Sequence, residues 1–467
     1  MADLSITRET SRAIGSERSS ALAFAVCCIV MLTMLLTPAI WNGFPIVFPD
    51  TGGYLARAFE GTLALGRSAV YGLILAAAIP LEFWPIVILQ AALCLWLILL
   101  ILRAHGLGGH PGTALAVVLG LCILTSVSWF SSQLMPDVLF PIAVLALYLL
   151  AFHWGALRSF ERLGLMLTIA LAVASHMAAL ALCLGLLSSL LILRRWKALR
   201  SARLPAPSVA LVAGVALLLA TNLGASGRFA FTPGGESFLF GRLLQDGFVD
   251  RYLREHCPDP SVQLCRYAGS LPDTADNWLW LAESPFRKLG GAIGYGNEER
   301  RIIIRSLIEH PIDHLVAVLQ DMAEQFASFR TEIVTDRGAM WHAEWTIETR
   351  APDAAADYHA ARQQQGFTDP VSGDWRSVLD LAPLNAIHLP FAWIGIAGLL
   401  GITISGRRLG LAPADTAFAT TVLLALAINA GVCATFANTV DRYQSRLVWL
   451  APFALAVILL RRRYSRA

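Results

Sequence analysis

The chain contains repeated apolar runs, each close to 20 residues long, and this repetition limits the folds open to it. The first run, Ala21–Ile40, carries no charged residue, and many similar runs follow it. A helix of about 20 residues spans the roughly 30 Å hydrocarbon core of a membrane. Hydrophobic residues make up 56% of the chain and charged residues only 15%, which argues against a set of soluble domains. The sequence therefore predicts an all-α polytopic membrane protein.

The first apolar run also resembles a signal peptide, because Arg8, Arg12 and Arg18 precede it. It is longer than the apolar core of a signal peptide, and similar segments follow it. We therefore predict that Ala21–Ile40 is an uncleaved first span and that residues 1–20 form a cytoplasmic tail.

Positive charges predict the orientation of the spans, because cytoplasmic loops are rich in Lys and Arg. The basic segments lie at the N-terminus, at Arg103, at Arg158 and Arg162, at Arg194–Arg203, at Arg407–Arg408 and at Arg461–Arg466. If all of them face the cytoplasm, about ten spans follow, with both termini inside. These spans lie near residues 21–40, 84–102, 113–131, 138–153, 163–175, 177–193, 208–224, 384–404, 412–434 and 446–462. The predicted location is a bacterial inner membrane, with an N-terminal module over 21–224 and C-terminal helices over 383–467.

One apolar piece, Ser68–Leu81, does not fit this topology. Counting it as a span would place later basic segments on the outside. It is also short and contains Pro80 near its end. We predict a re-entrant or interfacial helix within an outer loop over 41–83.

A polar stretch over 225–382 predicts one extracytoplasmic, mainly helical domain inserted between the two membrane modules. Apolar residues recur at helical spacing from Glu298 to Phe329, and Pro311 should divide this pattern into two helices. The stretch holds two cysteines, Cys257 and Cys265, in the segment CPDPSVQLC. A disulfide between them would suit an oxidising compartment, and two unpaired thiols are the alternative.

The predicted topology places ionisable residues from four separate parts of the chain at the outer membrane face. They are Asp50, Asp137, His176 and the segment Asp441–Arg446. Charged groups beside membrane helices are costly unless they are paired or functional. We therefore predict that these residues line one outward-facing site.

Two of these residues are acids with a functional and a structural interpretation. Asp50 lies between Pro49 and the flexible pair Gly52–Gly53, where a carboxylate would be suited to take a proton from an acceptor hydroxyl. Asp137 follows Pro136, and Gln133 would share its face if the helix continues. Either acid also fits the N-cap of a helix. His176 is either a polar turn residue or a group that reaches the substrate.

The segment DRYQSR predicts a phosphate site. Arg442 and Arg446 lie one turn apart at the start of a membrane helix, where free backbone N–H groups also favour an anion. Alternatively, Asp441 neutralises an interfacial arginine and Tyr443 anchors at the headgroups. We add Tyr54 to the candidate substrate-binding residues. Weaker candidate anion contacts in the polar domain are Arg242, Arg287, Lys288 and Arg330.

Taken together, an Asp in the first outer loop, the second acid of QLMPD and the Arg–Tyr of DRYQSR resemble the GT-C superfamily of membrane glycosyltransferases. The helix phrase IIIRSLIEHPIDHLVAVLQD is similar to one in the outer segments of these enzymes. The resemblance implies that Asp50 is the general base and that Asp137 positions acceptor or donor. It also implies that Arg442 and Arg446 hold a polyprenyl phosphate whose sugar is transferred with inversion. The lone Asp50 followed by Thr51 departs from the Asp–Glu pair of the protein O-mannosyltransferases.

Partners and cofactors follow from this interpretation. The expected partners are a lipid-linked sugar donor, membrane lipids and a glycan, lipid or protein acceptor, and no basic tract suggests nucleic acid. No metal is expected unless the donor is a diphosphate, which would call for a divalent cation. Two other functions are considered: a flippase or transporter of lipid-linked sugars, and a membrane acyl- or phospho-group transferase acting at the same face.

Overall fold

The computed structural model describes residues 3–196, 198–334, 337–368, 375–406 and 408–465. Lys197, Arg407 and Arg466, which belong to the predicted cytoplasmic basic segments, lie outside the described residues. Within these ranges the chain is mostly helical with very little strand, which confirms the all-α prediction. The strands in this part of the chain are β1 (Gly366–Thr368) and β2 (Trp375–Ser377), which pair antiparallel.

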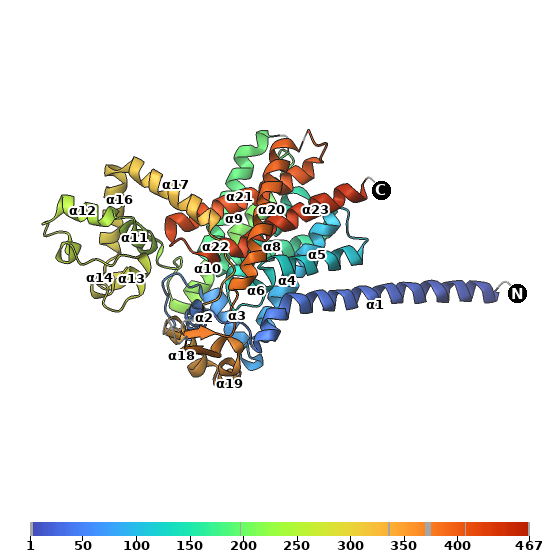
Figure 1. Ribbon diagram of the computed structural model, residues 1–467, viewed down its shortest axis with the longest axis horizontal. Helices are drawn as coiled ribbons and strands as arrows, with labels where there is room; N and C mark the ends of the chain where they lie inside the picture. Colours follow the sequence, from blue (N-terminus) through green and yellow to red (C-terminus); the bar gives the residue numbers. More distant parts are fainter. Residues whose placement is uncertain (1–2, 197, 335–336, 369–374, 407, 466–467) are drawn as a thin grey trace.

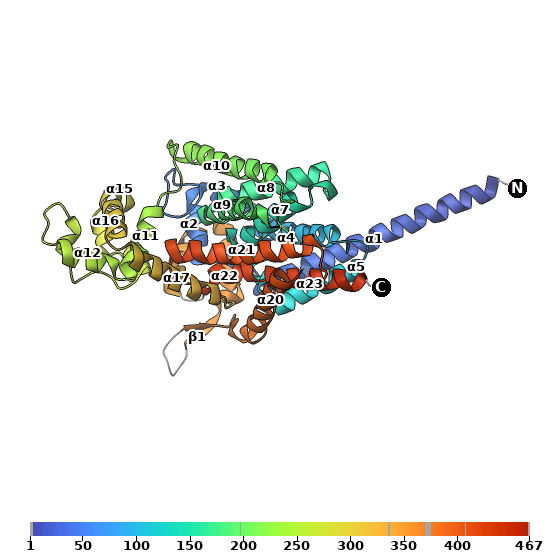
Figure 2. The ribbon, with the colours of Figure 1, turned by 90° about the horizontal axis from the view of Figure 1, so that it is seen from above.

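Among the described residues, seven helical segments are long and apolar enough to cross a membrane, as expected for a multi-pass membrane protein. They are Ala23–Asn42 of α1 (Asp3–Asn42), Trp84–Ala104 (α4), Met177–Arg195 (α9, Met177–Ile192, and η4, Leu193–Arg195), Pro205–Ser226 (α10), Ala382–Ser405 (η7, Ala382–Leu384, and α20, Asn385–Ser405), Pro413–Phe436 (α21) and Asp441–Tyr464 (α22, Asp441–Val448, and α23, Leu450–Tyr464). Helices α1, α10, α21 and α23 run along the long axis of the molecule, and both termini lie toward the same end (Figure 2).

Three further predicted spans correspond to shorter helices. They are α5 (Pro111–Leu124) followed by α6 (Val127–Ser131), η2 (Pro136–Val138) followed by α7 (Leu139–Phe152), and η3 (Trp154–Ala156) followed by α8 (Ser159–Ser175). Helix α5 ends where Thr125 adopts an extended conformation. Helix α7 has 14 residues and is about 21 Å long, less than the roughly 30 Å of a hydrocarbon core. It is nevertheless central, because every residue from Leu139 to Ala151 is buried.

The loop between α1 and α4, which the sequence predicts to lie outside, contains two short helices, α2 (Pro49–Arg57) and α3 (Ala69–Ala77), and a 3₁₀ turn, η1 (Ile79–Leu81). Helix α3 has nine residues and is about 14 Å long, too short to cross a hydrocarbon core. It packs against α2, α8 and α10. The apolar piece 68–81 is therefore a short helix packed on the bundle.

The segment predicted as a single domain, 225–382, divides into two groups of helices (Figure 1). The outer lobe has its own core around Phe240, Trp278 and Tyr295. Its elements are α11 (Gly235–Gln245), α12 (Phe248–His256), η5 (Gln263–Tyr267), α13 (Ala275–Trp280), α14 (Pro285–Lys288), α15 (Gly291–Gly294) and α16 (Gly296–Glu309). As predicted, Pro311 starts a new helix, α17 (Pro311–Ala327), which runs from the lobe to α21.

The second group consists of α18 (Arg337–Arg350), α19 (Pro352–Ala360), η6 (Arg362–Gln364) and the two strands. Its buried residues Met340, Ala343 and Ile347 belong to the same core as the membrane helices. Helix α18 packs directly on α2, where a Cβ on Gly52 would lie 2.6 Å from Cα of Ala343. This group is therefore a cover over the helix that carries Asp50, rather than a continuation of the outer lobe.

Candidate functional site

Backbone contacts place the two candidate acids side by side. The N–H of Ile46 donates to the carbonyl of Ser132 (2.9 Å), and the N–H of Leu134 donates to the carbonyl of Ile46 (2.9 Å). At the start of α2, the Thr51 hydroxyl donates to the carbonyl of Leu134 (3.0 Å). These bonds join the loop before α2 to the loop before η2, which carries Asp137.

Helix α22 delivers two arginines to these acids. Arg446 Nη1 lies 2.9 Å from Asp137 Oδ1. Arg442 lies between both acids, with Nη1 3.7 Å from Asp137 Oδ2 and Nη2 3.4 Å from Asp50 Oδ2. The predicted convergence of Asp50, Asp137 and the DRYQSR segment is thus present as a continuous chain of ion pairs.

A third arginine, Arg67, was not predicted as a site residue. It comes from the loop before α3, and its guanidinium forms an ion pair with Asp50. The ring of Trp280, at the end of α13, lies 4.7 Å from the Arg67 guanidinium carbon. One feature of the sequence could have identified Arg67. It lies in a loop predicted to face outward, where Lys and Arg are uncommon, so its charge is expected to have a partner. We call Asp50, Arg67, Asp137, Arg442 and Arg446 the outer cluster.

The outer cluster has an exposed end and a buried end. The side chain of Asp50 is 23% exposed, whereas those of Asp137 and Arg446 are 2% and 1% exposed. Three guanidinium groups face two carboxylates, so positive charge is in surplus. Arg442 Nε and Nη1 and Arg446 Nε find no hydrogen-bond acceptor among the described residues. Buried donors of this kind favour an anionic ligand.

The charges around Asp50 keep its carboxyl group ionised, which a proton acceptor requires. Burial alone would raise the pKa of its carboxyl group, but Arg67 and Arg442 outweigh burial and hold this pKa below its ordinary value. Helix α2 starts after Phe48, and the Asp50 carboxylate pairs with arginines. Asp137 likewise pairs with Arg442 and Arg446.

His176 and Tyr443 border the cluster through aromatic contacts. The Arg446 guanidinium carbon lies 3.5 Å from the centroid of the Phe140 ring, and the His176 ring lies 5.2 Å from the same ring. His176 Nδ1 accepts the N–H of Ala178, so this residue does cap α9. The Tyr443 ring lies 5.2 Å from the Arg442 guanidinium carbon and 5.3 Å from that of Arg446.

Tyr54 and Gln133 belong to a buried layer next to the cluster. The ring of Tyr54 packs edge-on against Tyr71, whose hydroxyl donates to Gln90 Oε1 (2.9 Å). Gln90 Nε2 in turn donates to the backbone carbonyl of Gln133 (2.7 Å). The side-chain oxygen of Gln133 is buried and finds no donor within the described ranges. These residues support the site from the side of α2 and the QLMPD loop.

The weaker candidate anion contacts lie away from the outer cluster or make other interactions. Arg242 Nη2 lies 2.7 Å from Asp246 and 2.6 Å from Asp321, and Lys288 pairs with Glu283, all in the outer lobe and α17. Arg287 is exposed on α14. Arg330 uses its backbone N–H, which donates to Asp441 (2.7 Å). Cys257 and Cys265 form a disulfide in the outer lobe.

The outer cluster can therefore take up a proton at Asp50 and hold an anion at its arginines. Short helices carry the Asp50 carboxylate and the arginines of α22, and long-range backbone hydrogen bonds between loops fix the spacing of these groups. No family model, curated protein or solved structure matches this chain. We therefore argue the chemistry of the cluster from its own residues.

Proposed function

We propose that this protein is a GT-C-type membrane glycosyltransferase that moves a sugar from a polyprenyl-phosphate donor to an acceptor hydroxyl, with inversion. The observation that carries the proposal is the outer cluster. An ionised carboxylate, Asp50, lies 3.4 Å from a guanidinium of Arg442, whose Nε and Nη1 donors have no acceptor among the described residues. A base beside an anion-binding group is what this transfer needs.

In the proposed reaction, Asp50 takes the proton of the acceptor hydroxyl as its oxygen attacks the anomeric carbon. The bond between this carbon and the phosphate oxygen breaks, and the electron pair leaves with the polyprenyl phosphate. Arg442 and Arg67 stabilise the negative charge that develops on the phosphate. Because the attack and the departure occur on opposite faces of the sugar carbon, the configuration inverts.

The buried residues would act by holding these groups in place. Asp137 and Arg446 fix the position of Arg442 through the ion pairs at 3.7 Å and 2.9 Å. The Nε of Arg446, which has no acceptor among the described residues, would add a donor at the deep end of the phosphate site. His176 and Tyr443 line the site, and Tyr54 and Gln133 support it.

The proposed membrane arrangement has ten crossings, with the short helices α5, α7 and α8 among them. Both termini face the cytoplasm of a bacterial cell, and the outer cluster faces the periplasm across the inner membrane. The basic last turn of α23, Arg461–Arg463, supports this orientation. The disulfide in the outer lobe fits an oxidising outer compartment.

The packing of the bundle supports an enzyme over a transporter. A transporter needs a polar path between the two faces. The central helix α7 is buried along its length, with Ile142, Leu145 and Leu149 each 0% exposed. These buried apolar side chains of α7 form a packed layer beneath the outer cluster.

The test is binding of undecaprenyl phosphate to the full-length protein in nanodiscs, with undecaprenol as the uncharged probe. We expect wild type to bind the phosphate more tightly than the alcohol, and Arg442→Met to lose on the order of 10- to 100-fold in affinity for the phosphate. Equal binding of the two lipids by wild type would overturn the proposal. Transfer of radiolabelled sugar from undecaprenyl-phosphate-linked donors then identifies the sugar.

A further inference from the structure

Helices α16 and α17, which connect the outer lobe to the membrane helices, expose a row of large aliphatic side chains. Each of these side chains is between 40% and 73% exposed, and they are Ile304, Leu307, Ile308, Ile312, Leu315, Val316 and Leu319. The last four follow the spacing i, i+3, i+4, i+7, so they lie on one face of α17. We call these seven residues the apolar face. Surfaces in contact with water rarely carry so many exposed aliphatic side chains together, so this face needs a partner.

The remaining sides of α17 are packed or polar, which fixes how the helix is rotated. The His314 ring stacks on an aromatic ring of the outer lobe. The Gln325 side chain accepts the N–H of Val440 (3.0 Å) and donates to its carbonyl (2.9 Å). Asp313 and Gln320 are exposed on a polar strip beside the apolar face. The apolar face is therefore held away from the protein.

The apolar face lies at the end of the bundle that carries the outer cluster. Helix α17 packs on α21, where a Cβ on Gly431 would lie 3.6 Å from Met322 Sδ. Gly431 lies about 7.5 Å from the end of α21 at Phe436, and Ile312 lies about 15 Å from Met322, at about 1.5 Å per residue. The apolar face thus reaches at most about 8 Å beyond the end of this candidate span, which is close to the roughly 5–8 Å thickness of a headgroup layer.

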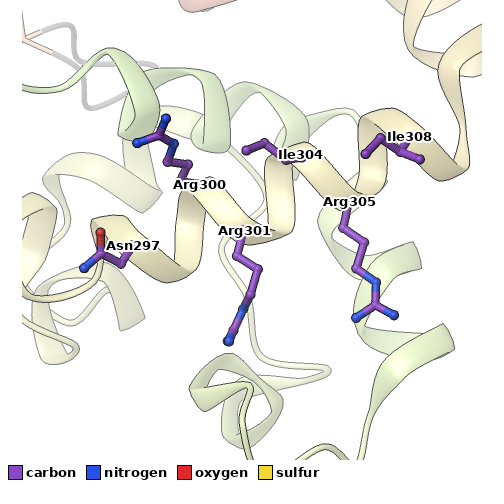
Figure 3. Close-up of a pocket in the computed structure, with 6 residues that line it drawn as sticks. All are labelled: Asn297, Arg300, Arg301, Ile304, Arg305 and Ile308. Carbon is purple, nitrogen blue, oxygen red and sulfur yellow. The ribbon is translucent and has the colours of Figure 1, made fainter.

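Basic side chains border the apolar face on α16. A shallow hollow on this helix is lined by Asn297, Arg300, Arg301, Ile304, Arg305 and Ile308 (Figure 3). The side chains of its three arginines are between 48% and 67% exposed. The acids in the first turn of α16 face inward instead: Glu298 accepts the N–H of Leu264, and Glu299 accepts the hydroxyl of Ser237. Helix α16 therefore presents positive charge beside exposed aliphatic side chains.

These arginines have protein partners but retain binding capacity. Arg300 lies 3.7 Å from Glu236, and Arg305 lies 3.2 Å from Glu309. Exposed pairs of this kind contribute little, and a guanidinium group has five donors, so further acceptors can bind. Lipid phosphates are acceptors of this kind. An apolar helix face bordered by long basic side chains is typical of a helix that lies in the membrane interface.

We propose that the apolar face docks on the lipid bilayer, at the membrane surface beside the outer cluster. Its aliphatic side chains would enter the headgroup layer, and Arg300, Arg301 and Arg305 would contact lipid phosphates. Continuity with α21, a candidate span, favours lipid over a second copy of the chain or another protein. Because Gln325 ties α17 to Val440, next to α22, this contact would hold the outer lobe at a fixed height over the outer cluster.

The experiment uses nitroxide labels on the full-length protein in nanodiscs. The half-buried cysteines Cys27, Cys28 and Cys122 are first replaced by Ala, and a label is then placed at Leu315→Cys or, as the matched control on the polar strip, at Gln320→Cys. Electron paramagnetic resonance measures collisions with O₂, which concentrates in lipid, and with a water-soluble nickel chelate. We expect the ratio of O₂ to nickel collisions to be at least about threefold higher at position 315 than at position 320. Circular dichroism and intact disulfide content check that each variant is folded.

The same labels test the arginines. With Arg300, Arg301 and Arg305 intact, the ratio at position 315 should be higher in nanodiscs that contain phosphatidylglycerol than in phosphatidylcholine alone, because anionic lipid attracts these side chains. The triple change Arg300→Gln, Arg301→Gln and Arg305→Gln should remove this difference. Equal ratios in the two lipids before the triple change would overturn the assignment of the arginines to lipid phosphates.

Two outcomes would overturn the docking surface itself. A label at position 315 that collides with nickel as often as the label at 320 would show that the apolar face is in water. A label at position 315 that is shielded from both O₂ and nickel would show that protein covers this face. None of these readouts depends on the proposed transferase activity.

Discussion

Two buried polar clusters lie at opposite ends of the same membrane helices, and they are built from similar residues. The outer cluster joins Asp50 and Asp137 to three arginines. The inner cluster consists of His105, Tyr148, His153, Asp415 and Arg461. Arg446 and Arg461 belong to the same apolar segment and are separated by about 22 Å, at about 1.5 Å per residue.

The charges of the inner cluster are balanced. Asp415 Oδ1 lies 2.8 Å from Arg461 Nη1 and 3.4 Å from His105 Nδ1, so one guanidinium faces one carboxylate. The Tyr148 hydroxyl lies 3.1 Å from His105 Nε2 and 3.0 Å from His153 Nε2, and it donates to the carbonyl of Ala414. Most polar atoms of this cluster are therefore paired with one another or with the backbone, and His105 Nδ1, 3.4 Å from Asp415 Oδ1, is the exception, because it makes no hydrogen bond among the described residues.

The comparison shows that residue type alone does not identify a functional site. Both clusters place carboxylates and guanidinium groups among buried apolar side chains. In the outer cluster positive charge is in surplus, and several guanidinium nitrogens lack acceptors among the described residues. We infer that the inner cluster fastens helices together, whereas the outer cluster keeps binding capacity for a ligand. The predictions below test this difference.

The largest effect is expected for Asp50→Asn. The amide cannot take the proton of the acceptor hydroxyl, so sugar transfer should fall by about 10²- to 10⁴-fold. The measurement is transfer from an undecaprenyl-phosphate-linked sugar, with binding of undecaprenyl phosphate as the control for an intact site. Full turnover in a folded Asp50→Asn protein would remove Asp50 from the mechanism.

The next effect is expected for Arg67→Met, which should slow transfer by about 10- to 100-fold through loss of a charge-assisted hydrogen bond. Arg67 is the main charge that lowers the pKa of Asp50, and burial raises it. Removal of Arg67 should therefore raise this pKa, and the acid limb of kcat/KM should move to higher pH. Rate–pH profiles of wild type and variant test this, and identical profiles would show that Arg67 does not act on Asp50.

Asp415→Asn at the inner cluster should lower the stability of the protein and leave sugar transfer nearly unchanged. The change leaves Arg461 and His105 without their carboxylate, and because Arg461 is partly exposed we expect a loss of about 2 kcal/mol in the free energy of unfolding. Transfer by the folded protein should stay within about twofold of wild type, since Asp415 lies far from the outer cluster. Thermal unfolding and transfer assays on the same preparation separate the two effects. A large loss of transfer with unchanged stability would show that the clusters are coupled.

The sequence predicted the helices of the bundle, because long apolar runs have few structural alternatives. It also predicted the meeting of Asp50, Asp137 and DRYQSR, because the alternation of spans limits where each loop lies. It did not predict the ion pair between Arg67 and Asp50, which depends on how the loop before α3 folds back over α2. The inner cluster was missed for a similar reason: His105 and Asp415 each resemble ordinary residues at a helix end until packing joins them. The division of 225–382 was missed because the apolar pattern of α18 does not show which core it joins.

The smallest predicted effect concerns the contact between the outer lobe and the outer cluster. Trp280 of α13 faces Arg67 at 4.7 Å, and a contact of this kind contributes about 0.5–1 kcal/mol at an exposed site. Trp280→Ala should therefore slow transfer by about two- to fivefold through looser positioning of Arg67, whereas Trp280→Phe, which keeps a ring, should slow it less. In an Arg67→Met background, Trp280→Ala should have no further effect, because its partner is already gone. If the two losses instead multiply independently, the outer lobe acts on transfer by a route other than Arg67.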